Sequence, residues 1–341
     1  MTQHTSETIR KPRTDDRPLW DLQFGSWGHT ALLVVHDLKL FPLLAEKPRT
    51  LAEVCEALNI ARRPAEALLT LCMSMGLAHL QDGHYALTPL AEDYLLDSSP
   101  TYIGGELDFS IASPLSFADL KKTVLTNAPQ YSGGDWVKAL EEQAEFARAF
   151  TRVMHSASMR PALAWPEVLD LSGHRRMLDI GGGSGAHCIG ATLRWPTLQA
   201  TVFDLAPVCE VAQEFVAHHG LQSRIRTHVG DMWNESFPSA DLYFYSMIYH
   251  DWPPEKCRLL TQKSFASLEP GGRIIIHEML YNDEKTGPFT VAAYNIGMLW
   301  GTEGQQFSGR ELSTMLSEAG FMDIEVKPTW GYWSIVTGRK P

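Results

Sequence analysis

The sequence predicts an α/β protein in which a mostly parallel sheet with helices on both faces follows a smaller, mainly helical unit. Two observations carry this prediction. From Arg176 onward, short apolar strands alternate with helical patterns, as they do in doubly wound sheets. Before that point, two helical segments and a short hairpin follow one another between residues 50 and 87. A chain of 341 residues is long enough for about two domains.

The N-terminal part is helical in its pattern. Residues 1–18 are polar and are expected to form a mobile arm, and apolar residues recur at helical spacing from Pro18 to Leu44. Thr50 and Glu53 have the spacing of a capping box, which predicts the start of a second helix. A helix over Arg62–Met75 and a hairpin over residues 79–87 then complete a winged-helix pattern.

A winged helix raises the question of DNA binding, and the charge of the chain argues against it. The formal net charge is −11, and no stripe of Lys and Arg occurs beyond the first dozen residues. The apolar helix faces instead favour a dimer-forming module. We therefore expect a homodimer and no nucleic-acid partner, with a ligand-sensing regulator as the alternative. This unit, with a helical connector, is expected to span residues 19–165.

The sheet-bearing domain is expected at residues 166–341. Its expected strands are 177–180, 201–204, 226–228, 242–247, 273–277, 324–328 and 333–336. In such a sheet, ligands bind beyond the carboxyl ends of the parallel strands.

A glycine-rich turn, RMLDIGGGSG at residues 176–185, follows the first of these strands. Glycine lets the backbone approach a nucleotide-like ligand closely. Asp204 ends the next strand about 20 residues later, where its carboxylate can accept both ribose hydroxyls. Gly181, Gly183 and Ala186 also fit a dinucleotide fingerprint. A further acid, Asp231, can take an adenine amino group, and this favours S-adenosylmethionine as the ligand.

His250 follows the fourth strand, and Glu278 ends the fifth. Neighbouring strand ends bring side chains together, so the carboxylate can hold the imidazole in one tautomer while His250 acts as general base. His277 points to the other side of its strand and is expected to be packed or capped. A divalent ion held by His250, Asp251 and Glu278 is the alternative, but no larger acidic cluster supports it, and no metal site is predicted.

The five cysteines are widely spread and form no C-x-x-C pair, which predicts neither a disulfide framework nor a zinc site. The N-terminus lacks an apolar signal core, and the run Ala31–Val35 is far too short for a membrane span. The sequence therefore predicts a cytoplasmic protein with no membrane partner.

Five segments together resemble the S-adenosylmethionine-dependent O-methyltransferases typified by caffeic acid and acetylserotonin O-methyltransferases. They are LDIGGGSG at 178–185, FDLAPV at 203–208, GDMW at 230–233, IYHDWPPEKC at 248–257 and LEPGGRIIIHE at 268–278. The resemblance implies a Rossmann-like class I methyltransferase domain with a seven-stranded sheet and a winged-helix dimerisation domain. The predicted cofactor-binding residues are Asp179, Gly181, Gly183, Gly185, Asp204, Leu205, Asp231, Met232 and Ser246.

The resemblance also implies a catalytic group of His250, Glu278 and a second acid, which aligns with Gln306 in GQQFSGREL at 304–312. An amide thus replaces a carboxylate, and the imidazolium gains less support. The acceptor pocket carries over as Phe150, Met154, Asn295, Met298 and Trp300. Trp300 is favoured because glycines at 297 and 301 leave backbone room beside its ring.

The predicted reaction is O-methylation of a hydroxylated aromatic or similar secondary metabolite, which releases S-adenosylhomocysteine. The change at Gln306 keeps other uses of the same cofactor open: methylation of carbon or nitrogen, or a reaction without methyl transfer such as cyclisation.

Overall fold

The computed structural model describes residues 11–131 and 135–341. The chain divides into two compact units, one that ends at Ile111 and one that runs from Ala112 to Pro341, and each is described by itself. The predicted arm at residues 1–18 lies in large part outside the described residues.

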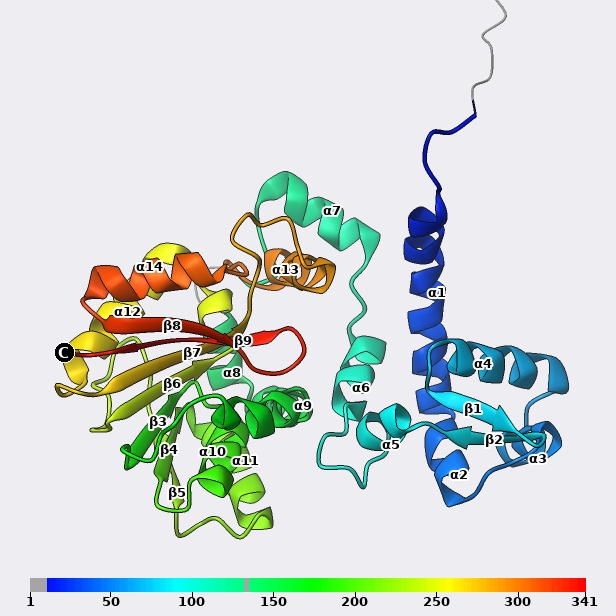
Figure 1. Ribbon diagram of the computed structural model, residues 1–341, viewed down its shortest axis with the longest axis horizontal. Helices are drawn as coiled ribbons and strands as arrows, with labels where there is room; N and C mark the ends of the chain where they lie inside the picture. The colour runs from blue at the N-terminus through cyan, green and yellow to red at the C-terminus, as the bar shows by residue number, and fades with distance from the viewer. Residues whose placement is uncertain (1–10, 132–134) are drawn as a thin grey trace, which may run out of the picture. The chain divides into compact units, whose positions relative to one another are not determined.

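The first unit is helical with one hairpin (Figure 1). Its elements are α1 (Arg17–Asp37), α2 (Leu40–Glu46), α3 (Leu51–Leu58), α4 (Arg62–Ser74), β1 (Ala78–Gln81), β2 (His84–Leu87), α5 (Pro89–Leu95) and α6 (Gly104–Ala112). The capping box at Thr50 and Glu53 is present, and the two strands pair antiparallel around a turn at Asp82 and Gly83. Both turn residues have positive φ, as a tight hairpin turn requires. The predicted order of helices and hairpin is confirmed.

Helix α1 leaves large apolar side chains uncovered. The exposed fractions are 70% for Leu19, 51% for Trp20, 61% for Leu22 and 67% for Trp27. Contiguous apolar side chains on a surface indicate an interaction face. No helix of the described residues is both long enough and apolar enough to span a bilayer.

The second unit contains a seven-stranded sheet in the order β5-β4-β3-β6-β7-β9-β8. The strands are β3 (Arg176–Ile180), β4 (Gln199–Asp204), β5 (Ile225–Val229), β6 (Leu242–Ser246), β7 (Arg273–Met279), β8 (Met322–Pro328) and β9 (Trp333–Arg339). The first five are parallel, and β9 inserts antiparallel between β7 and β8. The predicted α/β class with a mostly parallel sheet is confirmed.

Helices cover both faces of this sheet (Figure 1). The helices of the second unit are α7 (Phe117–Thr126), α8 (Asp135–Glu142), α9 (Ala144–Ala164), η1 (Trp165–Glu167), α10 (Ala186–Arg194), α11 (Ala206–His218), η2 (Tyr249–Asp251), α12 (Pro254–Ser267), α13 (Phe289–Gly301) and α14 (Gly309–Ala319). Helices α9, α10 and α11 share one apolar core with the sheet, and α12 and α14 share the other. On β7, Ile275 faces the first core, and Ile274 and Ile276 face the second, because strand side chains alternate.

The helices α7 to α9, expected as a connector within residues 19–165, cluster with the sheet-bearing unit. A Cβ built on Gly190 of α10 would lie 2.0 Å from the backbone oxygen of Ala162 of α9, so the two helix backbones approach closely. The domain boundary between residues 165 and 166 stays a prediction.

Candidate functional site

The glycine-rich loop after β3 has a backbone that other residues rarely adopt. Gly181, Gly183 and Gly185 have φ values of +67°, +56° and +76°. A Cβ on Gly181 would lie 2.4 Å from Cδ1 of Ile248, whereas one on Gly183 would meet open space. The loop is therefore packed on one side and open on the other, as a cradle for a ligand requires.

Asp204 ends β4 beside this loop. Its Oδ2 accepts a hydrogen bond from the Gly183 N–H at 2.8 Å, and its Oδ1 accepts one from the Leu205 N–H at 2.7 Å. Burial raises the pKa of Asp204 to about 6, although both hydrogen bonds oppose the change. Each oxygen keeps a free lone pair, so the carboxylate can still accept hydroxyl groups of a sugar.

Two further predicted residues, Asp231 and Met232, lie just beyond the end of β5. The Gly230 N–H donates to the Asp204 carbonyl at 3.0 Å, which brings Asp231 to the same sheet edge. Oδ1 of Asp231 accepts the Trp233 N–H at 2.8 Å. Met232 is half-buried and packs against the second core.

Asp179 differs from these residues because it is only 1% exposed. The thiol of Cys188 donates to its Oδ2 at 3.5 Å, and burial raises its pKa to about 7. A Cβ on Gly182 would lie 2.8 Å from the Asp179 carboxyl carbon, so the carboxyl group packs directly against the backbone of the loop at Gly182. Its role toward a cofactor stays a prediction.

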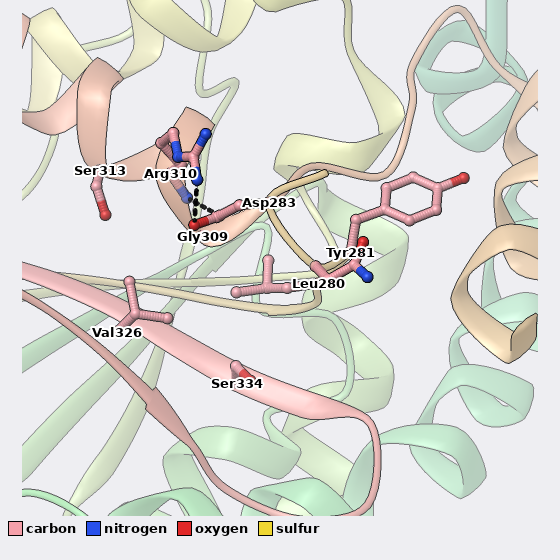
Figure 2. A pocket seen from close by; sticks show the side chains of 9 residues that line it. Leu280, Tyr281, Asp283, Gly309, Arg310, Ser313, Val326 and Ser334 are labelled. Atoms are coloured by element: carbon pink, nitrogen blue, oxygen red, sulfur yellow. Dashed lines mark hydrogen bonds and ion pairs between the residues drawn. The ribbon is translucent and has the colours of Figure 1, made fainter. Parts of the chain in front are cut away.

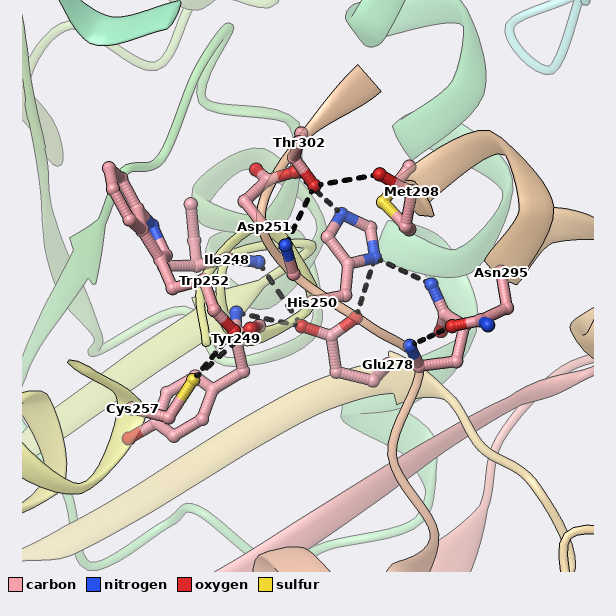
Figure 3. Close-up of polar contacts among 12 residues, drawn as sticks. Ile248, Tyr249, His250, Asp251, Trp252, Cys257, Glu278, Asn295, Met298 and Thr302 are labelled. Carbon is pink, nitrogen blue, oxygen red and sulfur yellow. Dashed lines mark hydrogen bonds and ion pairs between the residues drawn. The ribbon is translucent and has the colours of Figure 1, made fainter. Parts of the chain in front are cut away.

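His250 lies in η2, at the loop after β6, and is 4% exposed. Figure 3 shows Glu278 beside the ring of His250. Oε2 of Glu278 lies 3.2 Å from Nδ1 of His250, and Nε2 of Gln306 lies 3.1 Å from the same nitrogen. Oε1 of Glu278 accepts the N–H groups of Ile248 and Tyr249, each at 3.1 Å. Glu278 therefore fixes both the backbone before His250 and one side of its ring.

Burial shifts the pKa values of His250 and Glu278 in opposite directions. Burial lowers the pKa of His250 to about 3 and raises that of Glu278 to about 8, where the charge of Asp251 adds to the rise. Oε2 of Glu278 and Oε1 of Gln306 are buried and have no hydrogen-bond donor among the described residues. A proton on Nδ1 of His250 can satisfy Glu278, and a half-turn of the Gln306 amide can offer its oxygen instead.

The helix α13 supplies part of the predicted acceptor pocket. Oδ1 of Asn295 accepts the backbone N–H of Gln306 at 2.6 Å, so Asn295 holds the segment that carries the amide. The Met298 carbonyl accepts the Thr302 N–H at 2.8 Å, and the Trp300 carbonyl accepts the Gln130 N–H at 2.7 Å. The structure thus brings Asn295 next to Gln306, one of the three predicted catalytic residues.

The room expected beside Trp300 is untested by the chain itself. A Cβ on Gly297 or Gly301 would meet open space, so no neighbouring atom of the described residues packs closely against either glycine. Phe150 and Met154 lie half-buried on α9, which packs on α10 and α11. All three side chains stay predicted pocket residues.

Two carboxylates, those of Asp251 and Glu278, lie near the ring of His250. Asp251 Oδ1 lies 3.6 Å from Nε2 of His250, whereas Glu278 approaches Nδ1. The two carboxylates therefore flank the ring from opposite nitrogens. In the described part of the chain, no three His, Cys, Asp or Glu side chains gather as metal ligands.

The pairing of Ser246 with His277 was not expected from the sequence. Ser246 Oγ lies 3.0 Å from His277 Nδ1, and the two residues are register partners on β6 and β7. His277 is packed, as predicted, on the sheet face opposite to Glu278. Only the order of strands in the sheet could have indicated that this ring meets a predicted cofactor residue.

A separate cavity of about 590 Å³ opens between the end of β7, the start of α14 and the β8–β9 pair (Figure 2). The guanidinium of Arg310 and the carboxylate of Asp283 pair at 3.1 Å on its wall. It is lined by Leu280, Tyr281, Asn282, Asp283, Gly309, Arg310, Ser313, Val326 and Ser334, none of which is a predicted site residue.

Comparison with known proteins agrees with the resemblance. A family model described as an O-methyltransferase domain matches residues 117–322, and one described as an O-methyltransferase dimerisation domain matches residues 20–97. The 3-hydroxy-5-methyl-1-naphthoate 3-O-methyltransferase of Streptomyces sahachiroi is 34% identical over 90% of this chain and 89% of its own. The human acetylserotonin O-methyltransferase is 30% identical over 95% of this chain and 97% of its own.

A solved structure of human N-acetylserotonin methyltransferase in complex with SAM matches with a TM-score of 0.83 and 28% identity. It covers 97% of this chain and 99% of the other. The resemblance inferred from the five segments is confirmed, and the alternatives to O-methylation are not favoured.

Proposed function

Because this chain belongs to the O-methyltransferase family and uses S-adenosylmethionine, we propose that His250 is the general base for methylation of a hydroxylated aromatic or similar small metabolite. One observation carries the proposal: Nδ1 of the buried His250 lies 3.2 Å from Oε2 of Glu278 at neighbouring strand ends. The other ring nitrogen is then the one that takes the hydroxyl proton.

The residues fit the cofactor at three strand ends. Asp231 after β5 suits an adenine amino group, Asp204 at β4 suits the ribose, and the open side of Gly183 gives backbone room. When bound, S-adenosylmethionine supplies an electrophilic methyl group on a positively charged sulfur. We place Gly181, Gly185, Leu205, Met232 and Ser246 around it, with Asp179 below the loop.

The protein's own part in the reaction is to hold a proton and to position the acceptor. Nε2 of His250 has a free lone pair only when Nδ1 carries the hydrogen, and the Glu278 carboxylate stabilises that tautomer. The amide of Gln306 also lies next to Nδ1 of His250 and adds no charge there. Positioning by a dry pocket supplies much of the remaining rate.

The side chains proposed for the acceptor pocket suit a flat, apolar molecule. They are Phe150 and Met154 on α9 and Asn295, Met298 and Trp300 on α13. Aromatic and thioether groups pack well on aromatic rings.

We also propose a homodimer formed through the N-terminal domain. The exposed apolar side chains of α1 and the match to a dimerisation domain support it. The five free cysteines, four of them buried, fit a reducing cytoplasm.

Mass spectrometry tests the proposal. The full-length protein is incubated with S-adenosylmethionine and a panel of phenols, and we expect S-adenosylhomocysteine together with an O-methylated product. His250→Ala should lower the rate by about 100-fold or more while S-adenosylhomocysteine still binds. His174→Ala is the matched control, because His174 precedes β3 at the opposite sheet edge. Near-full activity of His250→Ala, or methylthioadenosine as the product, would contradict the proposal.

A further inference from the structure

His277 is a buried histidine that the proposed mechanism does not use. It has no exposed surface, and its ring stacks on Trp333 with 4.8 Å between centroids. Its Nδ1 lies 3.0 Å from Ser246 Oγ, and its Nε2 lies 3.3 Å from Thr329 Oγ1. Both ring nitrogens therefore have hydroxyl partners, which fixes the plane of the ring.

Burial of the ring favours its neutral form. Burial lowers the pKa of His277 well below its usual value, and the neighbouring His187, whose ring lies 5.3 Å away, adds to the effect. A neutral imidazole has one N–H and one lone pair. If Nδ1 carries the hydrogen, the Ser246 hydroxyl is free to donate elsewhere; if Nε2 carries it, Ser246 donates to Nδ1 and its oxygen is free to accept.

Ser246 stands beside the glycine loop. Asp179 on β3 pairs in register with Phe244 on β6, and two residues farther along each chain come Gly181 and Ser246. The next residue, Met247, has a φ of +56°, which is uncommon for a side chain of its kind. Ile248 then reaches Gly181 with its side chain. The half-buried hydroxyl of Ser246 is therefore held at the loop by a sharply turned backbone.

The strand order says which part of the cofactor meets this hydroxyl. Across the sheet, Asp231 follows β5, Asp204 ends β4, the glycine loop follows β3 and His250 follows β6. A molecule with its adenine at β5, its ribose at β4 and its sulfur near His250 brings its amino-acid tail to the loop and the end of β6. That tail carries an ammonium and a carboxylate group, and a fixed hydroxyl can serve either one.

We propose that His277 is a positioning residue for the methyl donor: through its hydrogen bond it orients the Ser246 hydroxyl toward the amino-acid tail of S-adenosylmethionine. The inference rests on the proposed function. A positioning role for His277 can be distinguished from a packing role. A ring that only fills the core affects the binding of every ligand of the loop equally, whereas a positioning residue affects only ligands that carry the amino-acid tail.

Isothermal titration calorimetry on the full-length protein tests the inference with two probes. S-adenosylhomocysteine has the amino-acid tail, and 5′-methylthioadenosine lacks it. His277→Phe should weaken binding of the first by about fivefold, as expected for one hydrogen bond, and leave the second within about twofold. His277→Asn keeps a hydrogen-bonding group near the position of Nδ1 and should restore most of the loss.

Ser246→Ala provides the second variant, because it removes a half-buried hydroxyl and does not depend on repacking of the core. It should reproduce the selective loss, and the double variant should add little to it. Equal weakening of both probes, or no weakening in Ser246→Ala, overturns the inference while the proposed function stands. Failure of the unaltered protein to bind S-adenosylhomocysteine overturns the proposed function and this inference together.

Discussion

Nδ1 of His250 lies 3.2 Å from Oε2 of Glu278, and the second carboxyl oxygen of Glu278 accepts two backbone N–H groups just before His250. One carboxyl group thus sets the ring and the backbone that carries it. The relationship follows from the parallel pairing of β6 with β7, which brings the two strand ends to the same sheet edge.

The rate should depend on pH through Glu278. Burial raises its pKa to about 8, so most of the carboxyl is protonated at pH 7, whereas the base-competent tautomer of His250 needs the carboxylate. The group must lose its proton, so kcat/KM should rise with pH and level off above about pH 8. Glu278→Gln is the control, because it should remove this rise. A profile in both proteins that levels off near pH 6.5 would contradict the assignment.

A carboxylate in place of Gln306 should strengthen the base. The Gln306 amide lies 3.1 Å from Nδ1 of His250 and adds no charge, so Gln306→Glu should raise the pKa of His250 by supporting the imidazolium. We expect the rate with weakly acidic phenols to rise by about threefold relative to strongly acidic ones. Histidine NMR and a phenol series measure both effects. Gln306→Met, a neutral control, should give no such gain, and equal changes for all phenols would refute the expectation.

The glycine loop offers a matched pair of substitutions. Gly181 and Gly220 both have a φ of +67°, but a Cβ would meet Ile248 at 2.4 Å at the first position and open space at the second. Each Gly→Ala change should reduce the free energy of unfolding by about 1 kcal/mol through backbone strain. Only Gly181→Ala should also weaken binding of S-adenosylhomocysteine, by about tenfold or more. Calorimetry measures the affinity and thermal unfolding measures the stability. Equal affinities of the two variants for S-adenosylhomocysteine would argue against the loop as the binding site.

The apolar surface of α1 predicts the effect of a charge on assembly. Trp27 is 67% exposed, and Trp27→Glu should convert the dimer to monomer in light scattering, because a buried unpaired carboxylate opposes association. Leu259→Glu on α12 is the control, since Leu259 is 60% exposed in the other unit. A dimer that persists in Trp27→Glu would place the interface elsewhere.

Local patterns in the sequence determined a large part of this protein. The capping box at Thr50 and Glu53, the seven strands and the glycine loop all follow from short-range spacing and from the conformational freedom of glycine. The order of acids at the strand ends also predicted that Asp204 and the loop meet, and their hydrogen bond is present.

Contacts between distant side chains did not follow from local patterns. The meeting of Gln306 with His250, 56 residues apart, was implied only by the family resemblance, and Ser246 meets His277 because β6 and β7 pair in that register. The insertion of β9 between β7 and β8 likewise depends on pairing between strands far apart in the chain. Sequence periodicity tells which face a residue occupies on its own element, but contacts between elements depend on strand order, register and packing, which no local pattern contains.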